Sequence, residues 1–533
     1  MVIERFDVVV MGSGAAGLTA ALIAADQGAR VLILEKSPLF GGTSAISGGQ
    51  LWVPNNRYLA PGADSVESAM KYLEAVTLGE VDTMLLEAFV KFAPQMASEI
   101  ERLTRLRFFV VDRSDYHSEW TGASWGRSLE PLPIDIDGLG DTAAYLRRST
   151  HRPPLTSVEI KGGQGLQLVA ERVSKNQVTQ GVALVSGLLE SCVAKGVTLR
   201  VGCRVAGIFG KESGARSVEF AADGASHRVE ARSVVIASGG FEWNKQMKAA
   251  FLSCVDDGAA SPPWNEGDGL RIGLSEGAAV ANMTQAWWSA AFRVPGEMYD
   301  GKQLVRNIVR ELALPGSILV NADGARFANE CSSYNALGKA FQVFDPSRNS
   351  YINKRAWLVF DQRFKEAYSV ATVSASTPAP DWFITGDSSD QLAAKAGINP
   401  EGLSQTLQRF NGFVAAGHDF DFGRGEAKHD QYHGDKSMPH ANLGEIAVPP
   451  FHAVPIFLGN LGTKGGLKTT VDGAVLDMDG DLLPGLFACG NAAASWMGPG
   501  YPGAGGSLGP IMTSAFLCGS AAAKVAGGSN LLH

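Results

Sequence analysis

The sequence predicts an α/β protein in which a Rossmann-like domain is built from both ends of the chain and an α+β domain is inserted between them. A strand–helix–strand unit with a glycine fingerprint opens the chain, and a glycine-punctuated strand and helix close it. The stretch between them has a different amino-acid composition. At 533 residues the chain is too long for one hydrophobic core, so two or more domains are expected.

The opening unit begins with a Val-rich apolar run at residues 6–11, which is typical of a strand buried on both faces of a parallel sheet. Residues 12–17 then read Gly-Ser-Gly-Ala-Ala-Gly and lead into an Ala-rich helix over residues 18–28. A second strand is expected at residues 31–34, with Glu35 at its end. This is a complete βαβ unit with the dinucleotide fingerprint in its proper context.

Further elements of the same texture follow along the chain. Residues 165–195 predict a helix, and residues 197–205 a strand. The apolar run at 233–240 ends in glycines, and the short strand at 485–491 repeats that pattern. Residues 501–509 are glycine-rich and precede an apolar, Ala-rich helix.

From about residue 295 to 460, polar loops, prolines and aromatic residues replace the glycine-punctuated strands. We therefore expect a first domain of residues 1–294 and 461–533, and an inserted substrate domain of residues 295–460. Residues 375–382 and 418–440 are expected to be loops of this insertion. The second loop carries four histidines that lack metal-ligand spacing and are expected to be solvated: His418, His429, His433 and His440. No metal site is predicted.

Composition and charge exclude several classes of partner. The net charge of −8 and the absence of a Lys/Arg run argue against nucleic acid. Neither a signal peptide nor a run of about 20 uncharged apolar residues is seen, so no transmembrane segment is expected. The six cysteines form no CxxC pair, which favours free thiols in a cytoplasmic protein. Peripheral membrane contact stays open.

Each part of the fingerprint has a physical task. Gly12 permits a tight turn, Gly14 lets the backbone approach a pyrophosphate, and Gly17 lets the helix sit close to the sheet. The helix N-terminus offers unpaired N–H groups and a positive dipole end to phosphates. Glu35 can accept hydrogen bonds from a ribose diol, and because it would repel a 2′-phosphate, NADP is disfavoured.

The next segment distinguishes among dinucleotides. Residues 36–49 form a long loop of glycines and hydroxyl residues, which would let a planar ring and a second phosphate pass close to the backbone. Residues 34–49, 488–491 and 502–509 resemble flavoproteins related to the fumarate reductase flavoprotein subunit and to the 3-ketosteroid dehydrogenases. The resemblance covers nearly the whole chain and implies FAD. No His lies within residues 36–49, so the FAD is expected to be non-covalent.

The resemblance also implies which residues hold the cofactor. Glu35 would hold the adenosine ribose, and Val205 would contact adenine through its backbone. Thr43 and Ser44, with the glycines that end the loop, would line the pyrophosphate and flavin. Asp268 and the C-terminal motifs would complete the site near the ribityl chain and the isoalloxazine. The full expected set is Gly12, Gly14, Ala15, Ala16, Gly17, Glu35, Lys36, Gly42, Thr43, Ser44, Gly48, Gly49, Val205, Ala237, Gly239, Asp268, Gly490, Asn491, Gly506, Ser507 and Leu508.

Removing two hydrogens from adjacent carbons beside a ketone needs a polarised carbonyl, a base for the α proton and a hydride acceptor. FAD supplies the acceptor. Residues 497–506 resemble the ketosteroid dehydrogenase pattern in which a Tyr and a Gly four residues later meet the substrate carbonyl. By this resemblance, the Tyr501 hydroxyl and the Gly505 N–H form a two-donor oxyanion hole.

The same resemblance implies the base. Residues 321–334 resemble the family's block in which a Tyr, here Tyr334, takes the proton. Tyr116 matches a Tyr that assists it, and Gly126-Arg127-Ser128 follows at the family's spacing. His117 stands where the family often has a second Tyr, so it either tunes the relay or faces solvent.

The roles of two aromatic residues stay open, and four alternative functions are weighed. Trp287 and Trp288 lie either under a flat substrate or in the core. The substrate is expected to be a 3-ketosteroid, desaturated at C1–C2. A Δ4-dehydrogenase or a desaturase of a smaller cyclic ketone is the close alternative, and the electron acceptor is unknown. A fumarate-reductase-like enzyme is disfavoured, because residues 461–466 replace the family's paired His and Tyr334 replaces an Arg. A non-catalytic flavoprotein is the remaining class.

Overall fold

An eight-stranded sheet carries the chain's opening βαβ unit in the computed structural model, which describes residues 3–210, 214–254, 256 and 258–528. The order along its main path is β25–β26–β11–β1–β2–β8, and β10 pairs with β11 and with β9. The pairs β1–β2, β1–β11, β2–β8 and β11–β26 are parallel. The strands are β1 (Glu4–Met11), β2 (Val31–Leu34), β8 (Thr198–Arg200), β9 (Arg204–Phe209), β10 (Arg216–Ala222), β11 (Ala225–Ile236), β25 (Ala474–Leu476) and β26 (Leu482–Ala488). Both chain ends therefore contribute strands to one sheet.

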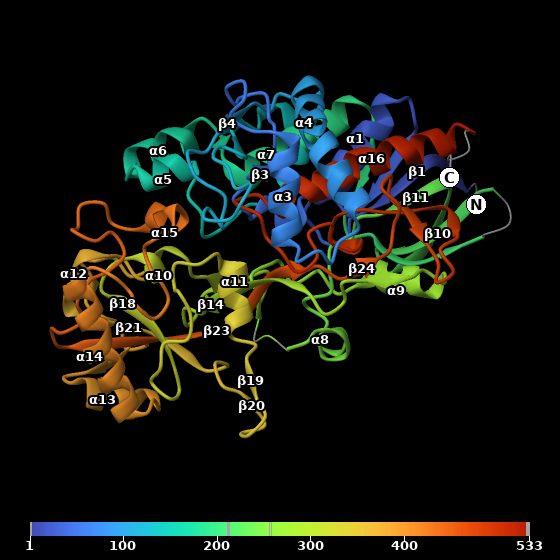
Figure 1. Ribbon diagram of the computed structural model, residues 1–533. Helices are drawn as coiled ribbons and strands as arrows, with labels where there is room; N and C mark the ends of the chain where they lie inside the picture. The colour runs from blue at the N-terminus through green and yellow to red at the C-terminus, as the bar shows by residue number, and fades with distance from the viewer. Residues whose placement is uncertain (1–2, 211–213, 255, 257, 529–533) are drawn as a thin grey trace.

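Helices cover one face of this sheet. α1 (Ala15–Asp26), α7 (Gln180–Ala194) and α16 (Leu508–Ala526) lie together above it (Figure 1). Val8, Val10 and Ile33 point into the core that these helices share with the sheet, whereas alternate strand residues such as Val9 and Leu32 point into a second core. Burial on both faces explains why the strands are continuously apolar.

α16 is long and apolar enough to cross a membrane by length and composition. It lies against α1 and β11, and 61% of its most apolar window is buried inside the protein. That position is typical of a core helix.

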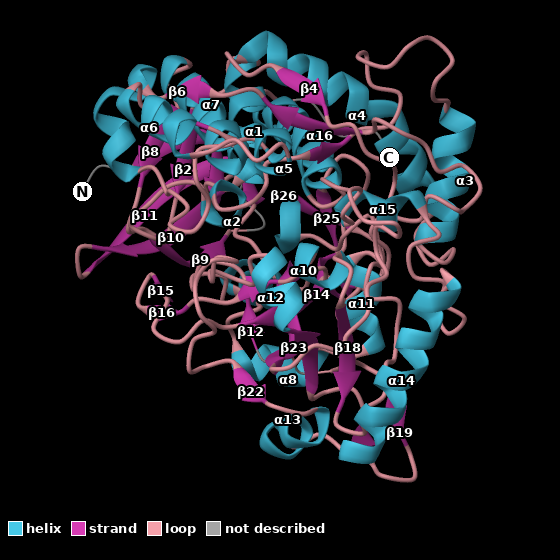
Figure 2. Ribbon diagram, turned by 90° about the vertical axis from the view of Figure 1, so that its left-hand side faces the viewer, coloured by secondary structure: helices cyan, strands magenta, loops and turns pink. Residues whose placement is uncertain are grey.

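A seven-stranded, mainly antiparallel sheet forms the second lobe (Figures 1 and 2). Its order is β17–β14–β23–β21–β18, with β12 and β22 also paired to β23. The strands are β12 (Gly258–Ala259), β14 (Ala286–Phe292), β17 (Arg306–Asn307), β18 (Ser317–Asn321), β21 (Ala356–Asp361), β22 (Ile384–Gly386) and β23 (Phe451–Thr463). Since β12 and β14 precede residue 295, the second sheet draws on residues that the predicted division places in the first domain.

Two helices, α13 (Ser389–Ala396) and α14 (Pro400–Ala416), cover the outer face of the second sheet (Figure 2). Its other face joins the core beneath the first sheet, and Trp288 and Phe292 belong to the same hydrophobic core as Val9 and Leu32. The two sheets thus share one core, and the connecting segments between them can form a site.

Two sequence-based expectations differ locally. The helix expected over residues 165–195 is split into α6 (Leu166–Ser174) and α7 by β7 (Gln177–Val178), because Asn176 and Gln180 adopt positive φ angles of 49° and 54°. The expected loop at 418–440 contains α15 (Lys428–His433).

The remaining elements connect the two sheets or cover their edges. They are α2 (Gly42–Ala45), β3 (Leu51–Trp52), α3 (Val66–Val76), α4 (Thr83–Leu103), β4 (Phe108–Val110), β5 (Ser128–Pro131), β6 (Ile134–Asp135), η1 (Asp137–Tyr145), α5 (Ser157–Lys161), α8 (Lys245–Phe251), α9 (Asp268–Ser275), β13 (Val280–Ala281), β15 (Met298–Tyr299), β16 (Lys302–Gln303), α10 (Arg310–Ala313), α11 (Tyr334–Ala340), β19 (Phe344–Asp345), β20 (Ser350–Tyr351), α12 (Gln362–Ala367), β24 (Gly466–Leu467) and η2 (Gly490–Ala492).

Candidate active site

A cleft opens where β1, β2 and β11 end, at the carboxyl edge of the parallel strands, where α/β sheets usually bind ligands. Most of the predicted cofactor residues line it. They are Gly12, Gly14, Ala15, Ala16, Glu35, Lys36, Gly42, Thr43, Ser44, Val205, Ala237, Gly239, Asp268, Gly490 and Asn491.

Glu35 is held at one end of this cleft. Its carboxylate accepts hydrogen bonds from the Ser13 N–H (3.0 Å), the Ser13 hydroxyl (2.7 Å) and the Ser37 N–H (2.8 Å). These three donors fix the orientation of the Glu35 carboxylate.

Asp268 lies near the same end of the cleft. It forms ion pairs with Lys36 (2.9 Å) and Arg204 (2.7 Å), so it stands beside the residues next to Glu35 and Val205. Burial opposes its ionisation, but these two cations lower the pKa of the Asp268 carboxyl.

Six predicted residues do not line this cleft: Gly17, Gly48, Gly49, Gly506, Ser507 and Leu508. Gly17 acts through packing, because a Cβ there would lie 2.0 Å from the Gly12 carbonyl oxygen. Gly49 packs on the backbone of Gln180, and Gly506 packs on Pro502.

The sequence reasoning also missed part of the lining. Some missed residues neighbour the fingerprint, and others come from distant segments that only the fold brings here. They are Met11, Ser13, Leu34, Ser37, Arg147, Cys203, Ser238, Pro262, Trp264, Asn265 and Ile511.

The three predicted tyrosines meet at one point between the two lobes. The ring centroids of Tyr334 and Tyr501 are 4.9 Å apart, those of Tyr116 and Tyr334 are 5.6 Å apart, and those of Tyr116 and Tyr501 are 5.5 Å apart. Tyr116 and Tyr501 stack at 15°, whereas Tyr334 meets both edge-on. Tyr116 and Tyr501 are buried and Tyr334 is half-buried. Residues more than 160 positions apart in sequence therefore form one phenolic cluster.

This packing changes the acidity of the phenols. Burial, followed by interaction with the hydroxyls of Tyr116 and Tyr501, holds the pKa of Tyr334 well above its ordinary value. Burial also raises the pKa of Tyr501. Both phenols are therefore protonated at neutral pH, which suits Tyr501 as a hydrogen-bond donor.

The loop that carries Tyr501 is anchored through its carbonyl groups. The Pro502 carbonyl accepts from the Tyr72 hydroxyl (2.6 Å) and from the Tyr116 N–H (3.1 Å). The Gly500 carbonyl accepts from Nζ of Lys464 (2.5 Å), and the Pro499 carbonyl accepts from the Asn335 amide (3.2 Å). Because Asn335 follows Tyr334, the last bond ties the Tyr334 helix directly to the Tyr501 loop.

Gly505, four residues after Tyr501, presents a main-chain N–H donor. Among the residues that the structure describes, none accepts a hydrogen bond from its N–H. Its φ of +87° favours glycine, and a Cβ would lie 2.5 Å from the backbone of Leu51 and Trp52. The glycine is thus required by its packing against β3, in addition to any need for ligand access.

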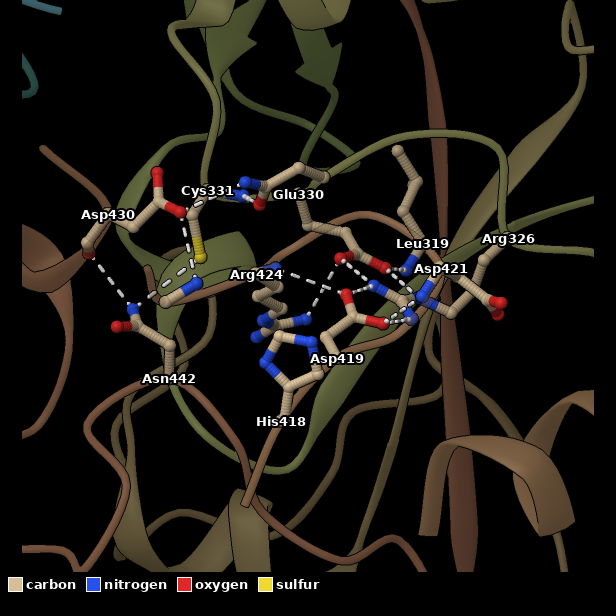
Figure 3. Close-up of polar contacts among 12 residues, drawn as sticks. Leu319, Arg326, Glu330, Cys331, His418, Asp419, Asp421, Arg424, Asp430 and Asn442 are labelled. Atoms are coloured by element: carbon tan, nitrogen blue, oxygen red, sulfur yellow. Dashed lines mark hydrogen bonds and ion pairs between the residues drawn. The ribbon is translucent and has the colours of Figure 1, made fainter. Parts of the chain in front are cut away.

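Tyr334 is the first residue of α11, which Ser333 caps by accepting from the Ala336 N–H (3.2 Å). A buried ion cluster stands just before it (Figure 3). Arg326 pairs with Glu330 (2.8 Å) and Asp419 (2.8 Å), and Glu330 also pairs with Arg424 (3.2 Å). Although burial opposes it, the two arginines lower the pKa of Glu330. The cluster ties the segment leading to Tyr334 to the one leading to α15.

The structure places the two tryptophans and the histidine whose surroundings the sequence left open. Trp287 meets Tyr501 edge-on at 5.3 Å and donates to Asn491 (3.0 Å), so it joins the tyrosine cluster to the cofactor cleft. Trp288 points into the core shared by the sheets. His117 stacks on Trp120 with a centroid distance of 3.9 Å.

Comparison with known proteins agrees with this arrangement. The family model described as "FAD binding domain" matches residues 7–508. The chain is 39% identical to 4-oxocyclohexanecarboxylate 2-dehydrogenase of Sinomonas cyclohexanicum, over 98% of this chain and 94% of that protein. It is 35% identical to 3-oxosteroid 1-dehydrogenase of Mycobacterium tuberculosis strain H37Rv, over 99% of this chain and 100% of that protein.

A solved structure adds the fold. The chain superposes with a TM-score of 0.91 and 32% identity on 3-ketosteroid Δ1-dehydrogenase from Sterolibacterium denitrificans in complex with 1,4-androstadiene-3,17-dione, covering 99% of this chain and 100% of that one. The chain belongs to the 3-ketosteroid Δ1-dehydrogenase family. As a member of this family it is an FAD-dependent oxidoreductase that acts on CH–CH groups.

The cleft of this 3-ketosteroid Δ1-dehydrogenase family member fits FAD. The N-terminus of α1 faces the cleft, and Gly14 leaves open space where phosphate can approach, with only the Ser44 hydroxyl within 4 Å of an added Cβ. The Ser238 hydroxyl is buried and has no hydrogen-bond partner in the described part of the chain, although it lines the cleft. An unpartnered hydroxyl in this position is available to a polar ligand.

Two further residues of this family member border the tyrosine cluster, and the sequence reasoning missed them. The Arg113 guanidinium carbon lies 5.1 Å from the Tyr116 ring centroid, and the His429 ring lies 4.6 Å from it. The expectation that His429 is solvated is wrong: α15 buries it against Tyr116. His418 and His440, in contrast, are exposed. No sequence signal distinguished these histidines, since only the fold decides which of them α15 turns inward.

Proposed function

We propose that this enzyme removes the α and β hydrogens of a ring ketone, as in the 1,2-desaturation of a 3-ketosteroid. The observation that carries the proposal is the convergence of three phenols, which Trp287 links to Asn491 in the FAD cleft. Gly505, four residues after Tyr501, adds a main-chain N–H that no described residue accepts. These are the groups needed to polarise a carbonyl and to take an α proton.

Tyr501 and Gly505 are proposed to bind the carbonyl oxygen. The raised pKa of Tyr501 keeps its hydroxyl protonated, and the Gly505 N–H has no competing acceptor among the described residues. One such donor contributes roughly 3–4 kcal/mol to stabilising the transition state. Negative charge then develops on the oxygen as the α C–H bond breaks.

Tyr334 is proposed to take the α proton, and Tyr116 to assist it. Bound FAD supplies the hydride acceptor, at its N5 atom, for the hydrogen that leaves the β carbon. The α proton passes to the Tyr334 oxygen, and the electron pair of that C–H bond becomes the second bond between the two carbons. The anionic form of Tyr334 needs help, and Tyr116 is the neighbouring phenol that can donate a hydrogen bond to it.

We further propose roles for the two lobes and a compartment. The first sheet and its helices would form the FAD domain, and the second lobe, which carries Tyr334, would serve as the substrate domain. Since no His lies in residues 36–49, FAD would be bound without a covalent link. Five cysteines of the described residues are buried and form no disulfide there, which favours a reducing compartment such as the cytoplasm; they are Cys192, Cys203, Cys331, Cys489 and Cys518.

A carboxylated cyclohexanone is the second candidate substrate class. The relative that is 39% identical is named for 4-oxocyclohexanecarboxylate. The α,β-desaturation of this ring uses the same carbonyl donors and the same base as ring A of a 3-ketosteroid.

Anaerobic mixing of the FAD-loaded enzyme with each class tests the proposal. We expect the flavin absorbance to bleach and a product two mass units lighter to form, with its new double bond next to the ketone by NMR. If neither a 3-ketosteroid nor a cyclohexanone carboxylate bleaches the flavin, the proposed function is wrong.

A further inference from the structure

The guanidinium of Arg113 is a buried cation without an anionic partner. Only 7% of the Arg113 surface is exposed to solvent. Within the described part of the chain, it makes no side-chain hydrogen bond or ion pair with protein, and its Nε atom has no partner. Its contacts are with aromatic faces: the guanidinium carbon lies 5.1 Å from the Tyr116 centroid and 4.4 Å from the Tyr432 centroid.

Such a group is costly to bury unless something compensates it. Desolvating a charge costs more free energy than an exposed cation–π contact returns. Arg127 differs from Arg113, because the Arg127 guanidinium forms ion pairs with Asp64 (2.6 Å) and Asp115 (2.7 Å). Arg113 therefore keeps its N–H donors for a ligand, and the fork of a guanidinium matches a carboxylate.

The surroundings of Arg113 favour an anion. His429 is buried beside the same Tyr116 ring, and its Nδ1 atom also has no partner among the described residues. The Lys161 ammonium lies 3.5 Å from the Tyr432 ring centroid, on the other side chain that Arg113 contacts. Burial, and then the charge of Arg113, lower the pKa of His429, so the local field is positive.

The nearby carboxylates are engaged elsewhere. Asp112 accepts from the Trp125 indole (2.5 Å). Glu130 accepts from the Ser157 N–H (2.8 Å) and from the Gln50 amide (2.8 Å). Neither carboxylate is within ion-pair distance of Arg113, so the positive charge stays available.

Arg113 lies close to the proposed ketone-binding site. Tyr116 stacks on Tyr501 at 5.5 Å, and Arg113 contacts Tyr116, so two successive ring contacts separate the cation from the carbonyl donor. A carboxylate that lies across one six-membered ring from a ketone can reach such a point. The acid side chain of a steroid lies several rings from its C3 ketone and would have to fold back.

We propose that Arg113 binds the carboxylate of the substrate, so that the substrate of this enzyme is a ring ketone that carries a carboxylate. This inference rests on the proposed function, and it narrows the substrate class of that same site. Arg113 touches substrate in this arrangement, and the unpaired Nδ1 of His429 gives the same carboxylate a second neighbour.

The test compares acid and ester substrates in matched variants. The FAD-loaded wild type and the variants Arg113→Gln, Arg113→Lys and Lys428→Gln are assayed with 4-oxocyclohexanecarboxylate, its methyl ester, a neutral 3-ketosteroid and a 3-ketosteroid with an acid side chain. Lys428 is exposed on α15 and serves as the control for a lost positive charge. We expect Arg113→Gln to lower kcat/KM for the monocyclic acid by at least about 30-fold, while the ester changes by less than about 3-fold.

Arg113→Lys, which keeps the charge but loses the fork, is expected to fall between wild type and Arg113→Gln on the acid. Lys428→Gln is expected to match wild type. Cyclohexanecarboxylate, which has no ketone, should compete with the methyl ester substrate in wild type and lose that inhibition in Arg113→Gln. If Arg113→Gln lowers turnover of the steroid acid alone, Arg113 still binds a substrate carboxylate, and the substrate that carries this carboxylate is a steroid.

Two outcomes would overturn the inference while leaving the proposed function intact. One is an equal loss on acid and ester in Arg113→Gln, and the other is turnover of the neutral steroid with no preference for any acid. If no ketone of either kind bleaches the flavin, the proposed function fails as well, so the two failures are distinguishable.

Discussion

Tyr334 is proposed as a base although burial raises the pKa of its phenol. The arrangement of its neighbours explains how it can still act. Tyr116 and Tyr501 meet its ring from two sides, and Tyr501 would be occupied by the carbonyl when substrate is bound. The phenol that remains for Tyr334 is then Tyr116, which Arg113 contacts on its own ring. The role proposed for each tyrosine therefore depends on the other two tyrosines of the cluster.

The first prediction at this scale concerns the base itself. Tyr334→Phe removes the proton acceptor but keeps the ring that packs on Tyr501, so we expect kcat to fall by about 10²–10⁴-fold with FAD still bound. Steady-state assays with an artificial electron acceptor and the flavin spectrum measure both. Tyr145→Phe, at a residue that is 49% exposed, is the control and should behave as wild type. Full activity of Tyr334→Phe would remove Tyr334 as the base.

The second prediction concerns pH. Proton removal needs the phenolate, and burial raises the pKa of Tyr334, so the active fraction is small at neutral pH and grows as pH rises toward that pKa. We expect kcat/KM to increase from about pH 7 to about pH 9 without reaching a plateau, since an ordinary Tyr already has a pKa near 10. A profile that is flat or falls over this range would contradict a neutral Tyr334 as the resting state.

At the scale of elements, α11 is positioned by contacts on both sides. Asn335 ties its first turn to the Pro499 carbonyl, and the cluster of Arg326, Glu330 and Asp419 fixes the segment before it (Figure 3). The same cluster holds the segment that leads to α15 and hence to His429. Tyr334 and His429 are therefore set by one buried network, although they lie on different elements.

The third prediction tests this network. Arg326→Ala leaves the carboxylates of Glu330 and Asp419 buried with fewer partners, and we expect the free energy of unfolding to drop by about 3–5 kcal/mol. Thermal unfolding of the FAD-loaded enzyme measures the loss. Arg348→Ala, whose ion pairs are at the surface, is the matched control and should barely shift the melting temperature. Equal melting temperatures for the two variants would show that the buried cluster does not stabilise the fold.

At the scale of the whole molecule, the FAD cleft draws on segments from residue 11 to residue 511. β1 and α1 from one chain end meet β26 and α16 from the other, and the second lobe adds Tyr334 next to them. A ligand in this cleft would contact both ends of the chain at once.

The fourth prediction follows from that coupling. A ligand that binds only the folded state stabilises it by about 2.7 kcal/mol at a concentration about 100 times its Kd. We expect the melting temperature to fall when FAD is stripped from the enzyme and to recover when FAD is added back. AMP, which can fill only the Glu35 end, should restore part of the shift. An unchanged melting temperature would mean that the cleft does not bind FAD in the folded state.

What the sequence by itself determined are features that depend on neighbours along the chain. The βαβ unit, the fingerprint at Gly12, Gly14 and Gly17, and the strand at 233–240 follow from local periodicity and glycine spacing. The positions of Tyr116, Tyr334, Tyr501 and Gly505 came from family resemblance, and the structure shows that the three tyrosines meet.

Only the tertiary structure decided which residues stand beside those tyrosines. Arg113 and His429 are ordinary residues of polar segments until folding buries them against Tyr116. The second sheet likewise takes β12 and β14 from before residue 295, because pairing with β23 depends on backbone edges that meet in space. The physical reason is the same in each case. Helix and strand periodicity is a short-range property of the chain. Burial, strand pairing and the residues that surround a charged group are instead set by contacts between segments far apart in the chain.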